Sequence, residues 1–343
     1  MKIIKIIFGV LVTLIVVTVI GLWGFLRFSG DEPHFAGTCE VLDLDVSAED
    51  IQVDRERGFA YLSMIDRAAL ARGAPAQGRI GRIDLNADPL TVEPALIDPP
   101  SHLRPHGLSL YIDEHGQRTL VLINHPVNRG VDPEHVELFT EEVPGRFRHV
   151  RTFTDELIAR PNDLVAVGPE QYYVANDSPP NSGLVTQLIY VDRDNARVVA
   201  EGIRSGGGIN ASSDGNTLYV AETGGQAIRV LKRDPTDGSV ETIDEIAIGT
   251  SPDNIDVAAD GSLWIGAHSN VPALVMHFIL GTDAPSQVLR IDVAADGSPS
   301  VEEIYLNRGA EISASSVGAT YGNKLLIGSI TAPKVLVCTM DEV

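Results

Sequence analysis

Three pairs of neighbouring oxygen-bearing side chains each precede a short apolar, β-branched run. The pairs are Glu49-Asp50, Asn162-Asp163 and Asp253-Asn254. Neighbouring side chains on an extended strand point to opposite faces, so one pair can serve two different sites. Carboxylate and amide oxygens, without thiols or clustered imidazoles, suit calcium better than zinc or copper. We therefore expect two oxygen-lined calcium sites close together.

The segments that must position these pairs repeat one unit, a turn followed by a short apolar strand. Six such units recur at intervals of roughly 45 to 60 residues, which is typical of propeller blades. They cover residues 57–62, 115–122, 168–175, 214–221, 260–266 and 321–328. Asp-Gly turns between β-branched and aromatic strands are what antiparallel blades need. The pattern predicts an all-β, six-bladed β-propeller with no long periodic helix after residue 30.

A dipeptide that is polar in five of the six cases precedes the apolar strand of each unit by about ten to fourteen residues, less than one blade's length. In a propeller this is the start of the innermost strand, which lines the shared central channel. The six positions are Glu49-Asp50, His106-Gly107, Asn162-Asp163, Gly207-Gly208, Asp253-Asn254 and Ser315-Ser316. Local turns or strand caps are the alternative for any one of them. Their common register favours a polar channel end.

The bulk properties restrict the partners. The chain has 343 residues and a formal net charge of -21, from 47 Asp+Glu and 26 Lys+Arg. This charge argues against nucleic acid or an anionic membrane surface as a partner and fits a solvated extracytoplasmic surface. Propellers of this length commonly form one domain. The oligomeric state is not determined by these features.

The first 30 residues form a targeting element. Lys2 and Lys5 precede an apolar stretch from Ile6 to Leu26, about the ~20 residues that span a bilayer. The stretch is long for a cleaved signal peptide and lacks a small-x-small cleavage site, so we expect a retained signal anchor, with cleavage as the alternative. The positive-inside rule then exports residues 31–343, membrane-anchored and facing the periplasm or the extracellular space.

The two cysteines, Cys39 and Cys338, stand at the two ends of the exported part. In an oxidising compartment they can pair. Closing so long a loop would stabilise the fold by roughly 4 to 5 kcal/mol or somewhat more in the chain-entropy model. Two separate buried thiols are the alternative reading.

At these residues the chain resembles the paraoxonase family of calcium-dependent lactonases and arylesterases, and more distantly the gluconolactonases of the regucalcin type. The similarity runs nearly continuously from Cys39 to Cys338. The segments that carry it are residues 47–50, 104–107, 122–126, 161–170, 208–210, 253–255 and 263–268.

The resemblance implies an amino-terminal hydrophobic helix, one disulfide joining the termini and two calcium ions stacked in the channel. The implied ligands of the catalytic ion are Glu49, Asn162, Asp253 and Asn254. The implied ligands of the deeper, structural ion are Asp50, Asp163 and the backbone carbonyl of Leu108. His106 and His125 match the family's histidine pair, while His268 and Asp177 match residues that line or support the pocket.

The chain departs from the family's pattern at one ligand. Gly207 stands where the family has an asparagine that binds the catalytic ion. Water, the backbone of residues 206–208 or weaker binding could account for the difference. Three pocket-wall positions, Ser205, Val275 and Thr331, also differ from bulkier family residues. A roomier or more polar pocket follows from these three.

The expected chemistry is hydrolysis of lactones, with aryl esters and phosphotriesters as promiscuous substrates and N-acyl-homoserine lactones among the acyl lactones that the resemblance suggests. Calcium would act as a Lewis acid on the carbonyl. His106 would deprotonate water, and His125 would orient it or relay the proton. A structural role remains the alternative for each histidine.

Other chemistries find little support. The sequence lacks a G-x-S-x-G elbow, a P-loop and a dinucleotide fingerprint. Two rival functions remain open: a sugar lactonase of the gluconolactonase type, in which the histidine pair is dispensable, and a non-catalytic ligand-binding propeller whose ion site has decayed at Gly207.

Overall fold

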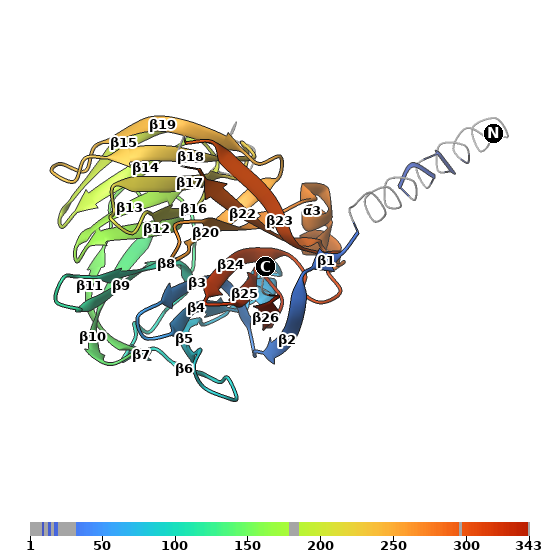
Figure 1. Ribbon diagram of the computed structural model, residues 1–343, viewed down its shortest axis with the longest axis horizontal. Coiled ribbons are helices and arrows are strands. Elements are labelled where there is room, and N and C mark those ends of the chain that lie inside the picture. Colours follow the sequence, from blue (N-terminus) through green and yellow to red (C-terminus); the bar gives the residue numbers. More distant parts are fainter. Residues whose placement is uncertain are drawn as a thin grey trace.

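Six antiparallel sheets stand around one axis in the computed structural model (Figure 1), which describes residues 32–177, 185–294 and 297–341 together with residues 9, 13, 14 and 17–19. Each sheet is one blade of a β-propeller. Apart from three outer-edge strands that come from earlier in the chain, the innermost strand of each blade comes first and the next strands follow outward as a meander. The predicted all-β, six-bladed architecture is confirmed.

Four strands make each blade, and two blades carry one added short strand at the outer edge. The first blade has β3 (Ser47–Asp54), β4 (Phe59–Ile65), β5 (Arg79–Asp84) and β6 (Val92–Pro94). The second has β8 (Pro105–Ile112), β9 (Arg118–Asn124), β10 (His135–Val143) and β11 (Arg146–Phe153), with β7 (Leu96–Ile97) added in parallel to β11. The third has β12 (Pro161–Gly168), β13 (Gln171–Asn176), β14 (Val185–Asp192) and β15 (Asn195–Arg204).

The remaining three blades follow the same order from the axis outward. The fourth has β16 (Gly206–Ala211), β17 (Thr217–Glu222), β18 (Ala227–Arg233) and β19 (Val240–Ala247). The fifth has β20 (Ser251–Val257), β21 (Leu263–His268), β22 (Ser286–Val293) and β23 (Pro299–Asn307), with β1 (His34–Phe35) outermost. The sixth has β24 (Ser315–Tyr321), β25 (Lys324–Ser329), β26 (Lys334–Met340) and, outermost, β2 (Gly37–Asp43).

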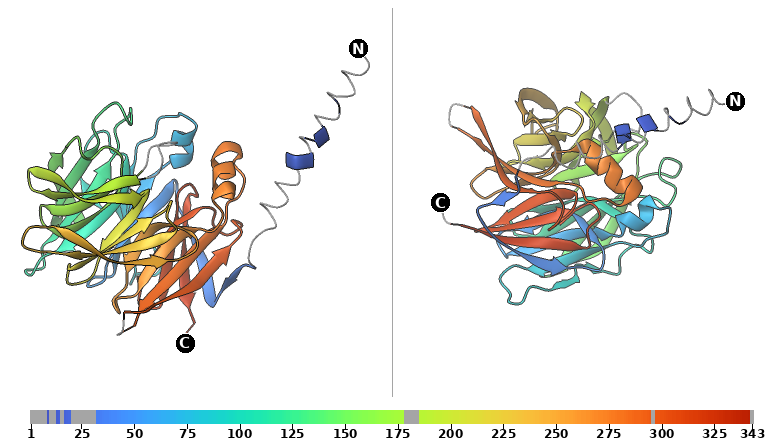
Figure 2. Two further views of the ribbon diagram at one scale, coloured as in Figure 1. Left: turned by 90° about the horizontal axis from the view of Figure 1, so that it is seen from above. Right: turned by 90° about the vertical axis from the view of Figure 1, so that its right-hand side faces the viewer.

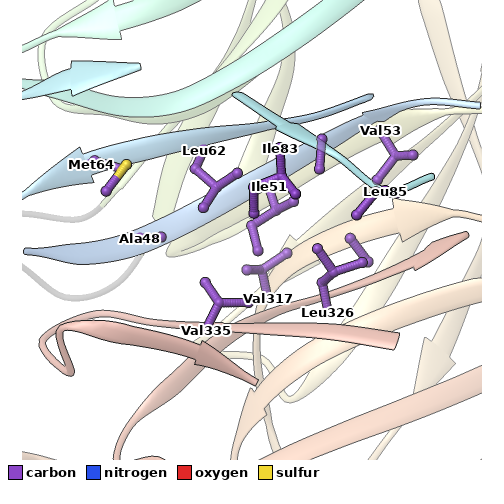
Figure 3. Close-up of a cluster of buried hydrophobic side chains, with 12 residues drawn as sticks. Ala48, Ile51, Val53, Leu62, Met64, Ile83, Leu85, Val317, Leu326 and Val335 are labelled. Carbon is purple, nitrogen blue, oxygen red and sulfur yellow. The ribbon is translucent and has the colours of Figure 1, made fainter. Parts of the chain in front are cut away.

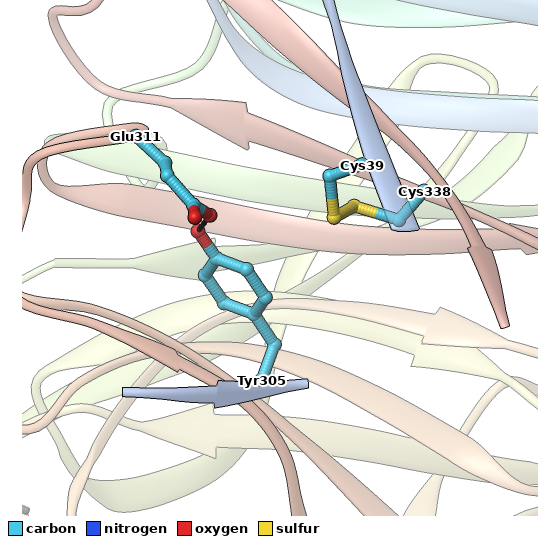
Figure 4. Close-up of a disulfide and its surroundings, with 4 residues drawn as sticks. All are labelled: Cys39, Tyr305, Glu311 and Cys338. Atoms are coloured by element: carbon cyan, nitrogen blue, oxygen red, sulfur yellow. Dashed lines mark hydrogen bonds between the residues drawn. A yellow bond between two sulfur atoms is a disulfide. The ribbon is translucent and has the colours of Figure 1, made fainter. Parts of the chain in front are cut away.

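The sixth blade joins the two ends of the propeller. Its outermost strand β2 comes from the start of the chain and pairs antiparallel with β26 from its end. Cys39 and Cys338 face each other in this register and form a disulfide (Figure 4), which confirms the predicted pairing. Figure 4 also shows Tyr305 of the fifth blade, whose hydroxyl donates a hydrogen bond of 2.8 Å to the Glu311 carboxylate. The ring of blades is therefore closed by hydrogen bonds and by one covalent bond.

Apolar side chains from adjacent blades form the core. Between the first and sixth blades, Ile51, Leu62 and Leu326 are completely buried in one cluster (Figure 3). Burying a side chain of this size is worth about 1.5–3 kcal/mol relative to leaving it exposed. Because each blade buries its faces against its two neighbours, the six innermost strands are held in a closed ring, in which β3 contacts both β8 and β24. That ring positions the site.

Two short helices interrupt the blades on one side of the propeller (Figure 2). They are α2 (Arg67–Ala71) after β4 and α3 (Val271–Leu280) after β21. Asn270 caps α3 by accepting a hydrogen bond from the backbone N–H of Ala273 at 2.9 Å, and Gly281 ends it in the left-handed conformation. The sequence analysis overlooked α3, although its cap residues were readable.

The described part of the chain contains no helix with both the length and the hydropathy of a membrane span. The predicted signal anchor at residues 1–30 lies largely outside the described residues.

Candidate functional site

A β-bulge lies at the predicted dipeptide in every innermost strand. The register with the second strand shifts between Ala48/Asp50, Pro105/Leu108, Pro161/Asp163, Gly206/Ile209, Pro252/Ile255 and Ser315/Val317. A bulge leaves residues unpaired and redirects their side chains. The dipeptides therefore lie within the strands, in bulges, and not at their ends as the sequence analysis assumed.

Asp50 and Asp163 are the buried acids of two non-adjacent blades, and their hydrogen bonds follow one pattern. Asp50 accepts the N–H of Ile51 at 2.7 Å and that of Leu108 in the next blade at 2.9 Å. Asp163 likewise accepts the N–H of Leu164 at 2.7 Å and that of Ile209 in the next blade at 2.8 Å. Each carboxylate thus links two neighbouring innermost strands across the channel wall.

Neither acid forms an ion pair with a positive side chain among the described residues, and the charge of one acts on the other. Burial raises the pKa of Asp50 well above its usual range, and the Glu49 charge raises it further. Burial also raises the pKa of Asp163, and the charge of Asp50 adds to the effect. Such a pair of carboxylates is costly to ionise together. A divalent cation between them would remove that cost.

Space beside Asp163 depends on a glycine of the neighbouring blade. A Cβ atom at Gly107 would lie 2.1 Å from Asp163 Oδ1 and 2.5 Å from its Cα. Only a residue without a side chain fits there. This explains why a glycine follows His106 in the innermost strand of the second blade.

Glu49, Asn162, Asp253 and Asn254 form a second set of oxygen atoms. The Asn254 amide donates to Glu49 Oε1 at 2.8 Å, while His268 Nε2 lies 3.1 Å from Asp253 Oδ2. Burial alone would raise the pKa of Glu49, but the neighbouring His106 and Arg67 lower it to about 2. Burial raises the pKa of Asp253, although its contact with His268 opposes the rise.

Two amide oxygens in this second set have no hydrogen-bond partner among the described residues. Asn162 Oδ1 and Asn254 Oδ1 are both buried. A buried carbonyl oxygen without a donor loses the energy of its hydration. Carboxylates combined with amide oxygens are the ligands that calcium prefers, so the residues present fit such an ion.

Carboxylates and imidazoles alone do not make a metal-binding site here. Among the described residues no group of three or more histidine, cysteine, aspartate or glutamate side chains is arranged to hold a metal ion. The fit to calcium therefore depends on the amide oxygens of Asn162 and Asn254 as much as on the acids.

His106 and His125 lie side by side, as expected of a catalytic pair. His106 Nδ1 lies 2.7 Å from His125 Nε2, and His106 Nε2 lies 3.5 Å from Glu49 Oε2. The backbone positions His125 directly after β9, because its N–H donates to the carbonyl of Arg104 at 3.0 Å. Burial, and then positive neighbours that include Arg129, hold the pKa of His125 well below its usual range.

A cavity of about 500 Å³ opens over these groups. Glu49, Asn162, Asp253 and both histidines contribute to its lining. The rest of the wall is largely apolar, with three arginines; its other members include Ile65, Arg67, Leu70, Arg104, Val127, Arg129, Phe278 and Ile330. The cavity therefore joins an oxygen-rich floor to a wall that suits a hydrocarbon chain.

Comparison with known proteins agrees with the resemblance noted in the sequence. A model of the arylesterase family matches residues 41–340. The serum paraoxonase/arylesterase 2 of Homo sapiens is 31% identical over 323 residues, which cover 88% of each chain. The serum paraoxonase/lactonase 3 of Rattus norvegicus is 32% identical over 331 residues, 90% of each chain.

This chain belongs to the arylesterase family. The resemblance to paraoxonases is thereby confirmed, as is the expectation of a hydrolase of the arylesterase and lactonase type. Among solved structures, the calcium-binding protein regucalcin from Agrobacterium tumefaciens has a TM-score of 0.51 at 16% identity, covering 90% of this chain and 96% of that one. At that identity the likeness bears on the fold alone.

The structure also accounts for the family departure at Gly207. A Cβ atom at Gly207 would lie 2.6 Å from the hydroxyl of Thr223. This hydroxyl donates to the carbonyl of Pro252 in the next blade at 2.8 Å. The space that an asparagine side chain would need is therefore partly taken by the residue that directly follows β17, the second strand of this blade.

Five residues were expected to line or support the pocket, and none of them is among the described residues that line the cavity. They are His268, Asp177, Ser205, Val275 and Thr331. His268 contacts Asp253, and the Ser205 hydroxyl donates to Asp177 at 2.7 Å. Thr331 Oγ1 lies 2.6 Å from His277 Nε2. Val275 is 49% exposed on α3. His268 and Thr331 thus contact groups near the site, while the apolar wall comes from other residues.

Several residues of the site were missed by the sequence analysis. Arg67 follows β4 and contacts both Glu49 Oε2 at 3.3 Å and the carbonyl of Pro105 at 3.0 Å. Glu134 precedes β10 and contacts His125. Phe278 lies on the overlooked helix α3. Arg67 and Glu134 carried no local sequence signal, whereas Asn270 and Gly281 could have revealed the helix that bears Phe278.

Proposed function

We propose that the chain hydrolyses lactones with calcium in the channel, with acyl lactones such as N-acyl-homoserine lactones as the natural class and aryl esters and phosphotriesters as promiscuous substrates. The observation that carries the proposal is the pair of buried amide oxygens without donors, Asn162 Oδ1 and Asn254 Oδ1, beside two carboxylates on the cavity floor.

Two groups of ligands follow from this proposal. Glu49, Asn162, Asp253 and Asn254 would hold a catalytic ion. Asp50, Asp163 and the Leu108 carbonyl would hold a structural one. When bound, the catalytic ion would supply the positive charge that stabilises the carbonyl oxygen as it becomes negative.

His106 is the proposed general base. Its Nε2 takes a proton from a water molecule, and the water oxygen attacks the carbonyl carbon of the lactone. The ring C–O bond then breaks, and the proton passes from His106 to the departing alkoxide, so the product is a hydroxy acid. His125 holds the other nitrogen of His106 at 2.7 Å and so orients the base.

The cavity wall suggests the part of the substrate beside the ring. Ile65, Leu70 and Phe278 offer apolar contacts above the polar floor. A lactone with an acyl side chain would bury that chain here and gain about 0.8 kcal/mol per methylene. A polar sugar lactone would gain little from the same wall.

We also propose that residues 1–30 anchor the enzyme on the outer side of a membrane. The support is the apolar stretch after Lys2 and Lys5 in the sequence, together with the Cys39–Cys338 disulfide, which is typical of an oxidising compartment. Recovery of the full-length protein in the membrane fraction tests this, and recovery as a shortened soluble form would contradict it.

Turnover of a substrate panel before and after exhaustive chelation tests the main proposal. The panel holds aliphatic lactones of increasing acyl length, an aryl ester and gluconolactone. Calcium-dependent turnover that is fastest for acyl lactones is the expected result. Preference for gluconolactone would favour a sugar lactonase, absence of all turnover would favour a ligand-binding propeller, and full activity after chelation would contradict the calcium role.

A further inference from the structure

A buried carboxylate stands behind the histidine pair. Glu134 precedes β10, and its side chain is 2% exposed. Its Oε2 lies 2.6 Å from His125 Nδ1, on the side of the ring opposite His106. Three titratable groups therefore form one chain of short contacts, Glu134 to His125 to His106, which ends at the cavity.

The carboxylate determines where the protons of both rings lie. Ionised Glu134 can only accept, so His125 Nδ1 must carry the proton that it accepts. A neutral His125 then has a bare Nε2, which accepts from His106 Nδ1–H. A neutral His106 in turn has a bare Nε2, which is the nitrogen on the cavity side. It lies 3.5 Å from Glu49 Oε2, beyond the usual length of a hydrogen bond, whereas Glu134 lies 2.6 Å from His125. The Glu134 carboxylate, as a hydrogen-bond acceptor, thus leaves the lone pair of His106 Nε2 directed at the cavity.

The surroundings keep His125 neutral. Burial, and then positive neighbours that include Arg129 and Arg67, hold its pKa well below the usual range. Contact with Glu134 is therefore a hydrogen bond between a neutral ring and a carboxylate, not an ion pair. Glu134 itself is held by Arg129, whose Nε lies 3.1 Å from Glu134 Oε1.

Arg129 also connects this arrangement to the cavity floor. Its Nη2 donates to the carbonyl of Pro161 at 3.0 Å. Pro161 immediately precedes Asn162, so the same guanidinium contacts the second and third blades. The loop that carries both Arg129 and Glu134 is thereby fixed at the innermost strands.

We propose that Glu134 is a positioning residue for hydrolysis, which selects the tautomers of His125 and His106 so that His106 Nε2 is unprotonated toward the cavity, and that Arg129 holds Glu134 in place for this role. The inference rests on the proposed function, because it needs His106 to act as the base.

Loss of the carboxylate would reverse the proton order. A glutamine at position 134 can donate its amide N–H to His125 Nδ1. His125 then carries its proton on Nε2 and donates to His106 Nδ1, which leaves the proton of His106 on Nε2. That nitrogen can no longer accept a proton from water. In serine proteases, an amide in place of the orienting carboxylate lowers kcat about 10⁴-fold through the same tautomer error.

The chain offers a matched control at Glu137, three residues along in β10. Its side chain is also 2% exposed and its Oε2 lies 2.8 Å from a histidine nitrogen, His149 Nε2. His149 is not among the described residues that line the cavity. Glu137→Gln therefore removes a buried carboxylate–histidine contact of the same kind without touching the proposed base.

Histidine side-chain ¹⁵N NMR of the full chain in calcium buffer tests the tautomers directly, with the His125 signals assigned from a His125→Asn variant. In the unmodified protein we expect the proton of His125 on Nδ1 and a bare Nε2. In Glu134→Gln we expect the proton on Nε2, and in Glu137→Gln no change. A wild-type His125 with its proton on Nε2 would overturn the inference without any activity measurement.

Lactone kinetics test the consequence. Glu134→Gln should lower kcat by about 10²- to 10⁴-fold with KM changed less than about threefold, and Glu134→Asp should recover most of the loss. Glu137→Gln should keep kcat within about twofold. Unchanged kcat in Glu134→Gln would overturn the inference, whereas absence of turnover in the unmodified enzyme would overturn the proposed function and leave the NMR result to decide on the tautomers.

Discussion

At the scale of single residues, the candidate site assigns cation binding and proton transfer to different side chains. Glu49 stays ionised because His106 and Arg67 lower its pKa to about 2. His125 stays neutral because its burial excludes the charged form. A permanently ionised carboxylate suits a ligand for a cation, and a neutral imidazole suits a relay. The two roles are thus distributed between neighbouring groups on one cavity floor.

Replacing the proposed base should abolish most of the turnover. His106→Gln keeps a polar side chain of similar length but cannot take a proton from water, so we expect kcat for a lactone to fall roughly a hundredfold or more. Steady-state kinetics measure the loss. His115→Gln is the control, because that ring is 81% exposed and should leave kcat unchanged. A wild-type rate in His106→Gln would assign proton transfer to another group.

The buried His125 should make stability depend on pH in a defined direction. Its pKa is lowered in the folded state, so below the ordinary value of about 6.5 the unfolded chain binds a proton that the folded chain does not. Stability is therefore lost as pH falls from about 6.5, by up to about 1.4 kcal/mol per pH unit for this group.

Urea unfolding at pH 7 and pH 5.5, with calcium held constant, measures this effect. The unmodified protein should lose more stability between the two pH values than His125→Asn does. Equal losses in both proteins would show that His125 is protonated in the folded state at pH 5.5.

The limits of sequence analysis are clearest for the histidine pair. His106 lies in the innermost strand and His125 directly follows β9, so their blade repeat makes their proximity predictable. Glu134 belongs to an irregular loop between strands, and its contact with His125 depends on how that loop folds back. No periodicity encodes such a contact.

At the scale of elements, the bulges of the innermost strands do most to build the site. They leave Glu49, Asn162 and Asp253 outside the regular pairing with the second strands. The six-fold repeat of a turn followed by a short apolar strand predicted these strands and their order. It did not reveal the bulges, because a one-residue insertion depends on the register with a partner strand.

The bulge at Gly207 leads to a prediction about calcium affinity. Gly207→Asn alone should not tighten binding, because its side chain meets the Thr223 hydroxyl and a threonine side chain is stiff at χ1. The double variant Gly207→Asn/Thr223→Ala removes that obstacle and should tighten binding by about tenfold through the added oxygen ligand.

Calorimetric titration of the chelated proteins with calcium measures both variants, with Thr223→Ala alone as the control. Equal tightening in the single and double variants would show that Thr223 does not limit the space. No tightening in the double variant would place the ion away from position 207.

At the scale of the whole molecule, function depends on a closed ring. Residues from blades far apart in sequence meet at the axis only if the sixth blade joins the strand β2 to β26. The placement of Cys39 and Cys338 near the two ends of the propeller predicted the disulfide between them, and the structure confirms it. The helix α3, by contrast, is not part of the repeated strand pattern, and the sequence analysis overlooked it.

Removing the disulfide should lower stability more than activity. Cys39→Ser/Cys338→Ser releases a cross-link over 299 residues, and the chain-entropy model gives a loss of about 5–6 kcal/mol. Denaturant unfolding measures the loss, and lactone turnover at 25 °C should stay within about twofold because the cavity floor is untouched. Unchanged stability would show that β2 is held by its hydrogen bonds and packing alone.

A crystal structure of the protein grown with calcium, with anomalous diffraction data, tests the central claim most directly. We predict a calcium peak at about 2.3–2.6 Å from a Glu49 carboxylate oxygen and from the side-chain oxygens of Asn162, Asp253 and Asn254, and a second peak beside Asp50 and Asp163. A calcium-saturated crystal with no anomalous peak among the first four residues would contradict the account.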